Sequence, residues 1–200
     1  MTTLLQISTS LFSEDGQSSR LSRDFVAAWQ ARHPDGRVVV RDLAAQPLPH
    51  LTAERFQAFL AKPETRPPAQ QAIVAESDAL IAELQAADAV VLGLPMYNFG
   101  IPSTLKAWID HVARAGITFR YTANGPDGLL ADRKLTVLAA RGGHYVGTPR
   151  DTQTSYIRDF FNFIGIRDID FVYAEGLAVG EDARRTALDA AHQRIEALAA

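Results

Sequence analysis

Hydrophobic residues along the chain gather in short runs rich in leucine and β-branched residues, separated by longer stretches with an amphipathic pattern. Short apolar runs predict buried strands, and apolar residues recurring at helical spacing predict helices. A regular alternation of the two is typical of successive strand–helix–strand units around a parallel sheet. The predicted strands are LLQIS (4–8), RVVVRDL (37–43), AVVLGL (89–94), KLTVLAA (134–140) and DIDFVYAEGL (168–177).

Helical periodicity fills the gaps between these strands. Apolar residues recur at i, i+4, i+7 and i+8 within 21–29, and at i, i+3, i+4 and i+7 within 105–112. Further helices are predicted at about 75–86, 151–164 and 182–199. The last of these is rich in alanine but keeps an apolar stripe, so we interpret it as a packed helix.

Two segments interrupt the alternation. Residues 44–72 contain a short amphipathic helix between proline-rich connections, and residues 119–134 contain two apolar runs that flank ANGPDG, a hairpin or turn pattern. Long excursions on an α/β scaffold are usually functional or interfacial, so each is a candidate lid or subunit contact. No repeat or linker divides the chain, and we expect a single domain over residues 1–200.

The composition narrows the classes of function. The chain has 200 residues, of which 47% are hydrophobic, and this suffices for one buried core. A formal net charge of −3 argues against a nucleic-acid partner. The chain has no cysteine, which excludes disulfides, thiolate nucleophiles and iron–sulfur ligation, so any redox chemistry requires a bound cofactor.

The remaining composition arguments concern metals, membranes and localisation. Four of the five histidines, His33, His50, His111 and His192, show neither the H-x-x-x-H spacing on one helix face nor a cysteine partner, so no metal site is expected. No segment approaches the ~20 apolar residues that span a bilayer, and the N-terminus lacks a basic leader. We therefore expect a cytoplasmic protein with no membrane partner.

The loop after the first strand, residues 8–21, is rich in hydroxyl groups. It contains neither a dinucleotide-binding glycine pattern nor a nucleoside triphosphate loop. Hydroxyls and the unpaired N–H groups of a helix N-terminus can hold a phosphomonoester without any lysine. The alternative is a serine-rich loop with an ordinary helix cap. The polar and small residues here are Ser8, Thr9, Ser10, Ser13, Gly16, Gln17, Ser18 and Ser19.

The loop after the third strand reads PMYNFGIP (95–102). It follows a continuous apolar run, and the carboxyl ends of such strands form the ligand crevice of an open α/β sheet. Tyr97 and Phe99 alternate with Met96 and Asn98, so apolar groups can cover a planar ring while the amide meets its polar edge. This pattern suits a flavin, and the alternative is a turn whose aromatic residues fill a gap in the core.

The loop after the fourth strand, AARGGHY (139–145), has two adjacent glycines, which let the backbone approach a ligand and direct consecutive N–H groups at it. Donors fixed there would stabilise the charge that a flavin ring gains on accepting hydride. The alternative is a plain glycine turn. His144 adjoins this loop and is a candidate catalytic residue, although a histidine beside a turn is equally often a solvated bystander.

With these residues the sequence resembles the FMN-dependent NADH-azoreductases, relatives of the flavodoxin-like quinone reductases. PMYNFGIPSTLKAWIDHVARAGITFRYTANGPDGLL (95–130) is similar to that family nearly residue for residue, and ARGG, FIGI and AEGL recur in the expected order. The resemblance covers essentially the whole chain and is weakest over 44–72. It implies an α/β fold, a flavodoxin-like three-layer sandwich around a five-stranded parallel sheet with strand order 2-1-3-4-5.

The resemblance also implies the residues of the site. The FMN phosphate is expected at Ser10, Gly16, Gln17 and Ser18; the ring is expected between Met96, Tyr97, Asn98 and Phe99 on one side and Ala140, Arg141, Gly142 and Gly143 along its pyrimidine edge. The family often has serine where Ala140 stands, and SQS where this chain reads GQS. A homodimer is implied, with Tyr121 and Phe163 at the aromatic positions that line a substrate pocket completed by the partner subunit.

The implied activity is transfer of hydride from NADH to FMN, followed by passage of two electrons to an azo compound or a quinone by a ping-pong mechanism. Two alternatives stay open. One is a flavodoxin-type one-electron carrier, against which a net charge of only −3 argues, because such carriers dock through a strongly acidic face. The other is a quinone or nitroaromatic reductase with incidental azo activity, which the sequence cannot separate from an azoreductase.

Overall fold

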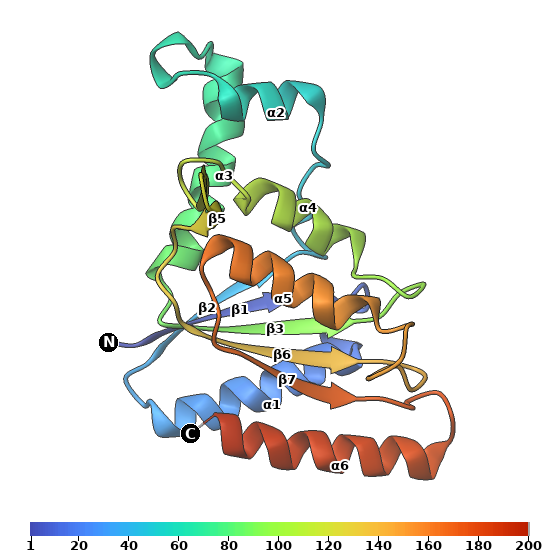
Figure 1. The fold of residues 1–200 in the computed structure, drawn as a ribbon. Helices are drawn as coiled ribbons and strands as arrows, with labels where there is room; N and C mark the ends of the chain where they lie inside the picture. The colour runs from blue at the N-terminus through green and yellow to red at the C-terminus, as the bar shows by residue number, and fades with distance from the viewer. Residues whose placement is uncertain (200) are drawn as a thin grey trace.

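Five strands, all paired in parallel, form the central sheet of the computed structural model, which describes residues 1–199. Their order is β2-β1-β3-β6-β7 (Figure 1). The labels differ from the predicted 2-1-3-4-5 because β4 and β5 belong to a separate two-stranded sheet. The five strands are β1 (Thr3–Ser8), β2 (Arg37–Asp42), β3 (Ala89–Pro95), β6 (Lys134–Ala140) and β7 (Ile169–Ala174).

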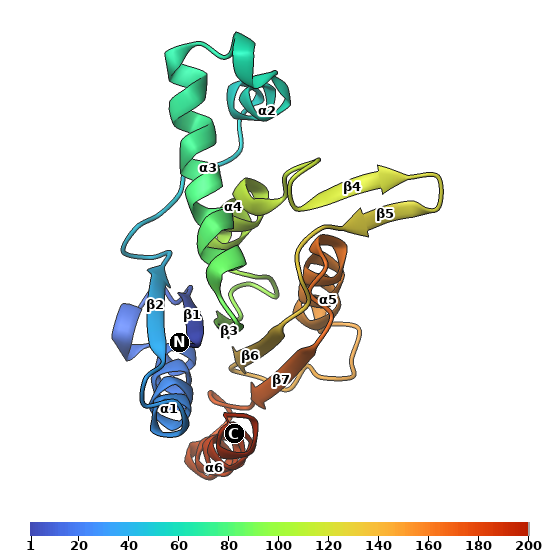
Figure 2. The same ribbon diagram turned by 90° about the vertical axis from the view of Figure 1, so that its left-hand side faces the viewer.

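Helices cover both faces of the sheet (Figure 2). One hydrophobic cluster forms against α1 and α6 and includes Phe25 and Trp29, and the other forms against α3, α4 and α5 and includes Trp108 and Phe161. The central strands β3 and β6 are buried along nearly their whole length, which explains why their sequences are continuous apolar runs. The helices are α1 (Gln17–Arg32), α3 (Pro68–Ala86), α4 (Ser103–Val112), α5 (Thr152–Ile164) and α6 (Glu181–Leu198).

The segment 44–72 contains the predicted short amphipathic helix, α2 (Ala53–Leu60), which begins after Thr52; the Thr52 side chain accepts a hydrogen bond from the Arg55 N–H. The next helix begins at Pro68 and not near residue 75, because proline suits the first turn of a helix, where its missing N–H is not needed. Helix α2 and the adjoining part of α3 extend beyond the sheet (Figure 1).

The predicted hairpin consists of β4 (Phe119–Thr122) and β5 (Gly125–Gly128), paired antiparallel. Its turn is shorter than predicted, because Gly125–Gly128 form a strand and only Ala123 and Asn124 connect the two. The Thr122 hydroxyl closes this turn by donating to the Gly125 carbonyl at 2.8 Å and accepting from the Asn124 N–H. The hairpin projects from the body of the molecule (Figure 2).

The last strand, β7, is shorter than predicted. It ends at Ala174 because Gly176, with φ of +74°, turns the chain. The N–H groups of Leu177 and Ala178 then donate to the carbonyls of Arg141 and Gly142. The chain after β7 therefore crosses the carboxyl edge of the sheet. Within residues 1–199, none of the helices combines the length and the apolar character needed to cross a membrane.

Candidate functional site

A pocket of about 210 Å³ lies at the carboxyl edge of the sheet. The loops that follow β1, β3, β6 and β7 all contribute to it, as expected for parallel strands whose carboxyl ends share one edge. The three loops selected from the sequence therefore meet at one place. The lining residues are Ser10, Phe12, Gly16, Gln17, Ser18, Pro95, Met96, Tyr97, Ala140, Arg141, Gly142, Leu177 and Ala178.

Nine of the twelve residues predicted to bind the cofactor line this pocket, and Asn98, Phe99 and Gly143 do not. Asn98 and Gly143 each follow a lining residue in the chain, whereas Phe99 lies one residue further away. Sequence reasoning missed Phe12, Pro95, Leu177 and Ala178. The signal for Leu177 and Ala178 was present, because the fifth predicted strand also ends at this edge of the sheet.

The part of the pocket next to α1 is suited to an anion. The first N–H groups of α1, like those of every helix, have no intrahelical acceptor. Gly16, which precedes the helix, supplies no side chain to cap them. The Ser18 side chain is 1% exposed, and its hydroxyl has no hydrogen-bond partner in the described part of the chain. Buried hydroxyls are normally hydrogen-bonded, so an unpartnered one indicates a ligand atom at this position.

Gly16 leaves room for the Ser10 hydroxyl. A Cβ atom at residue 16 would lie 2.0 Å from Ser10 Oγ. The Ser10 hydroxyl accepts a hydrogen bond from the Phe12 N–H at 3.2 Å. The GQS sequence of this chain is therefore matched to the side chain of Ser10, which fills the space that a residue larger than glycine would need.

The loop after β3 contains a strained turn. Tyr97 and Gly100 exchange two backbone hydrogen bonds, of 3.1 and 2.9 Å, and Asn98 and Phe99 between them have φ of +49° and +64°. Two consecutive residues with left-handed backbone form a type I′ turn. Asn adopts this conformation easily, but for Phe99 it is strained and costs about 1–3 kcal/mol. This geometry places Asn98 and Phe99 at the tip of the turn and leaves Met96 and Tyr97 to line the pocket.

The loop after β6 presents free backbone donors. The carbonyls of Gly142 and Gly143 accept hydrogen bonds from Ala178 and Gly176, but among residues 1–199 no acceptor is recorded for the N–H groups of the two glycines. The Arg141 N–H is different, because it donates to the Ala174 carbonyl at 2.9 Å. The edge of the pocket at Gly142 can therefore donate a main-chain hydrogen bond to a bound ligand.

Comparison with known proteins places the chain in a family. The profile of a family described as having a flavodoxin-like fold matches residues 2–199. The chain belongs to this flavodoxin-like family. It is 58% identical over 181 residues to an FMN-dependent NADH:quinone oxidoreductase of Cellvibrio japonicus, covering 90% of this chain and 91% of the relative. It is 56% identical over 192 residues to the protein of the same name from Alcanivorax borkumensis, covering 96% and 97%.

Solved structures give the same result. An azoreductase from Bacillus anthracis matches with a TM-score of 0.91 and 29% identity, covering 100% of this chain and 99% of that one. An FMN-dependent NADH-azoreductase from Bacillus anthracis, solved in complex with FMN, matches with a TM-score of 0.90 and 26% identity, covering 100% and 98%. The family resemblance predicted from the sequence is confirmed.

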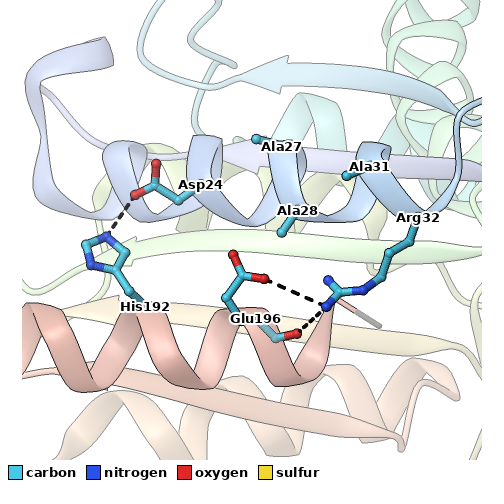
Figure 3. A pocket seen from close by; sticks show the side chains of 7 residues that line it. All are labelled: Asp24, Ala27, Ala28, Ala31, Arg32, His192 and Glu196. Carbon is cyan, nitrogen blue, oxygen red and sulfur yellow. Dashed lines mark hydrogen bonds and ion pairs between the residues drawn. The ribbon is translucent and has the colours of Figure 1, made fainter.

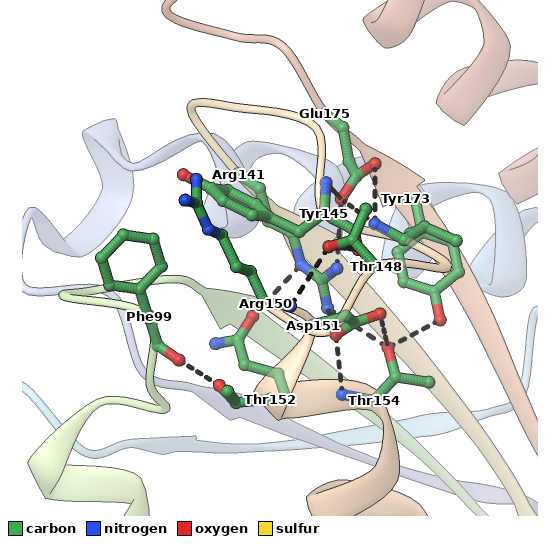
Figure 4. Close-up of polar contacts among 12 residues, drawn as sticks. Phe99, Arg141, Tyr145, Thr148, Arg150, Asp151, Thr152, Thr154, Tyr173 and Glu175 are labelled. Carbon is green, nitrogen blue, oxygen red and sulfur yellow. Dashed lines mark hydrogen bonds and ion pairs between the residues drawn. The ribbon is translucent and has the colours of Figure 1, made fainter.

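In this flavodoxin-like protein the side chain of Arg141 belongs to a buried network beside the pocket (Figure 4). Arg141 is 1% exposed; its guanidinium forms ion pairs with Asp151 at 2.9 Å and Glu175 at 3.1 Å, and donates to Gln153 at 3.2 Å. None of these partners lines the pocket. The guanidinium is therefore committed to the protein, and only the main chain of Arg141 is available to a ligand.

The network makes stability depend on pH through Asp151. Burial alone would raise the pKa of this carboxyl, but hydrogen bonds from Thr154 and Arg141 hold it below its ordinary value. A lowered pKa gives stability that is present above the unfolded-state pKa and lost as pH falls through the folded-state pKa.

We expect the free energy of unfolding of Asp151→Asn to fall less steeply than that of wild type below about pH 4. Urea unfolding between about pH 2 and 7 measures this, with the exposed Asp35→Asn as control; equal acid sensitivity in wild type and Asp151→Asn would contradict it.

His144 lies outside the pocket. Its ring packs against Gly176, where a Cβ atom would stand 2.6 Å from His144 Cε1. It lines a separate groove against α6, together with Val146, Tyr173 and Glu175. The structure therefore gives His144 no place in the pocket lining, and its catalytic role stays a prediction.

A further hollow lies on the surface between α1 and α6 (Figure 3). Three alanines of α1 form its floor, and two polar contacts bridge the helices, a hydrogen bond of 3.0 Å between His192 Nε2 and Asp24 and an ion pair of 3.7 Å between Arg32 and Glu196. The four side chains are all more than a third exposed, so these contacts contribute little stability. We interpret this hollow as the packing seam of two helices.

Proposed function

We propose that this flavodoxin-like protein passes two electrons from NADH through FMN to a quinone or an azo compound. FMN-dependent oxidoreduction is the activity named for its relatives, including NADH:quinone oxidoreductases and azoreductases. The observation that carries the proposal is the buried Ser18 hydroxyl, which has no partner in the part of the chain that the structure describes and lies in a pocket that also offers helix and loop N–H groups. These are the donors that a flavin mononucleotide requires.

The phosphate of FMN would be held by Ser10, Ser18 and the first N–H groups of α1. Each hydrogen bond to a charged group contributes about 1.5–3 kcal/mol, so several can hold a phosphate without a cationic side chain. Arg141 is the one basic residue among those that line the pocket, and its guanidinium is paired elsewhere. The site therefore depends on hydroxyls and the helix dipole.

The ring of FMN would be held by Met96 and Tyr97 on one side and by the main chain of Ala140 and Gly142 at its polar edge, with Leu177 as an additional apolar contact. When bound, FMN supplies the two-electron redox chemistry. The protein contributes binding, orientation and an N–H donor fixed at the ring edge. One stacking platform shared by donor and acceptor leads us to propose ping-pong kinetics.

We further propose a homodimer in which the partner's hairpin completes the substrate pocket. The pocket lies at the start of α5, where Gln153 contacts Pro95, and the hairpin lies at its end, where Leu130 N–H donates to the Ile164 carbonyl. Helix α5 has 13 residues and so spans about 20 Å. The aromatic residues at the far end of α5 are therefore too distant to line the pocket of the same subunit, and we propose that they line the pocket of the partner subunit.

Tyr121 and Phe163 form part of one aromatic cluster at that far end. The Phe163 ring lies 4.2 Å from the ring of Phe119, and the Tyr121 ring lies 5.6 Å from it. Phe163 is partly buried against the core, whereas Tyr121 is 75% exposed. Of the two, Tyr121 is the side chain better placed to contact a substrate bound to the partner.

The proposed function is tested with the purified protein. We expect heat to release a yellow ligand identified as FMN, and NADH-dependent reduction of a quinone and an azo dye. Double-reciprocal plots at several quinone concentrations should give parallel lines. Colourless protein that takes up no FMN would contradict the cofactor, intersecting lines would contradict the ping-pong mechanism, and no turnover with either acceptor would favour an electron carrier.

The catalytic role predicted for His144 has a separate test. Because the side chain lies outside the pocket, His144→Ala should leave the dissociation constant of FMN unchanged within about twofold. A catalytic role requires turnover to fall by about 100-fold or more, the usual size of a general acid–base contribution. Steady-state kinetics and FMN titration measure both quantities, and unchanged turnover or an equal loss in both would contradict the role.

A further inference from the structure

The first turn of α5 holds the loop that follows β3. Gln153 is completely buried, and every polar group of its side chain is used. Its amide nitrogen donates to the Pro95 carbonyl at 2.9 Å and to the Gly100 carbonyl at 3.0 Å, and its oxygen accepts from Arg141 Nε at 3.2 Å. One side chain therefore fixes both ends of the loop 95–100.

The neighbouring residue adds a third anchor. The Thr152 hydroxyl donates to the Phe99 carbonyl (Figure 4). Two adjacent residues of α5 thus hold three carbonyls of a loop that contains the strained turn at Asn98 and Phe99. A strained turn persists only when its surroundings fix it, and these hydrogen bonds supply that constraint.

The same glutamine connects this loop with the loop after β6. Arg141, which Gln153 contacts through Nε, also pairs with Glu175. Glu175 in turn accepts hydrogen bonds from the N–H groups of Tyr145 and Val146, at 2.9 and 3.1 Å. A continuous chain of polar contacts, buried at Gln153 and Arg141 and more exposed at Val146, therefore links the two loops that face each other across the pocket.

We propose that Gln153 is a positioning residue for the flavin ring, with Thr152 as a second anchor. It does not line the pocket but sets the spacing of the residues that do, chiefly Met96 and Tyr97 against Gly142. This inference rests on the proposed FMN site. The inference gives the first turn of α5 the role of fixing the position of the flavin ring. Neither the residue types of this turn nor their position in the sequence indicates that role.

Glutamine is suited to this role because it combines two donor hydrogens and one acceptor. An ionised glutamate keeps the acceptor for Arg141 but donates to neither carbonyl. A methionine has a similar length and forms neither kind of hydrogen bond. Comparing glutamine, glutamate and methionine at position 153 therefore distinguishes the effect of anchoring the loop 95–100 from the effect of the hydrogen bond with Arg141.

The test uses full-length apoprotein titrated with FMN, with flavin fluorescence for affinity and the visible absorption and circular dichroism of bound FMN for ring environment. We expect Gln153→Met and Gln153→Glu each to raise the dissociation constant about tenfold or more and to alter both spectra. Thr152→Ala, at an exposed position, should raise it about threefold to tenfold. The control is Ser77→Ala, which removes a buried hydrogen-bonding hydroxyl that does not line the pocket and should change neither affinity nor spectra.

Several results would overturn the positioning role. The role is contradicted if Gln153→Met keeps wild-type affinity and spectra, or if Gln153→Glu keeps wild-type affinity. It is also contradicted if Ser77→Ala has an equal effect. If the Gln153 variants do not fold, an unchanged affinity in Thr152→Ala contradicts it. If wild-type apoprotein itself takes up no FMN, the proposed function fails and this inference fails with it. If wild type binds FMN and the variants bind equally well, only the inference fails.

Discussion

Ser18→Ala is expected to weaken FMN binding by about 10- to 100-fold while leaving the apoprotein as stable as wild type or more stable. The two effects have opposite signs because the Ser18 hydroxyl is buried and has no partner within residues 1–199, whereas the proposed phosphate would supply one. Removing it eliminates the cost of an unsatisfied polar group, about 1–3 kcal/mol, from the apoprotein. FMN titration by fluorescence and urea unfolding of the apoprotein measure the two quantities.

The matched control for this prediction is Ser22→Ala, one turn further along α1. The Ser22 hydroxyl is also fully buried, but it donates to the Ser18 carbonyl at 2.8 Å. Its removal should lower stability and leave FMN affinity nearly unchanged. If Ser18→Ala instead destabilises the apoprotein as much as Ser22→Ala and binds FMN normally, the phosphate is not held where we propose.

Arg141→Met is expected to lower the free energy of unfolding by about 3–5 kcal/mol, because it leaves two carboxylates without their buried partner. The side chains of Asp151 and Glu175 are only 9% and 13% exposed, so solvent cannot replace the guanidinium. The loss should shrink on acidification, since protonation removes the unpaired charges. Urea unfolding at pH 7 and at about pH 4 measures both effects.

Two further variants delimit this prediction. Arg120→Met removes an ion pair with Asp127 whose side chains are 61% and 40% exposed, and should cost less than about 1 kcal/mol. Adding Asp151→Asn to Arg141→Met should recover part of the loss, because one unpaired charge is removed. A loss in Arg141→Met no larger than that in Arg120→Met would show that the buried network does not stabilise the fold.

Features of the site that depend on a short stretch of sequence were predicted correctly. Continuous apolar runs predicted β3 and β6 because a strand buried on both faces has no polar positions. The end of each run then located a loop, and parallel strands bring such loops to one edge. This is why Ser18, Met96 and Gly142, far apart in the chain, could be assigned in advance to one pocket.

Side-chain direction was not predictable in the same way. The family resemblance placed Arg141 at the cofactor, but its guanidinium pairs with residues 10 and 34 positions away. His144 belongs to the same loop and lines a different groove. Pattern reasoning assigns a residue to a loop, and only packing decides which way its side chain turns.

The sequence by itself determined the order of strands and helices, the three loops that carry the pocket and the family to which the chain belongs. Each of these follows from periodicity or from matching residues along one stretch of chain. Only the tertiary structure decided that Ser18 is buried with no hydrogen-bond partner among residues 1–199, that Gln153 joins two loops, and that the hairpin carrying Tyr121 lies at the end of α5 opposite the pocket. These properties arise from contacts between segments distant in sequence, which no local pattern records.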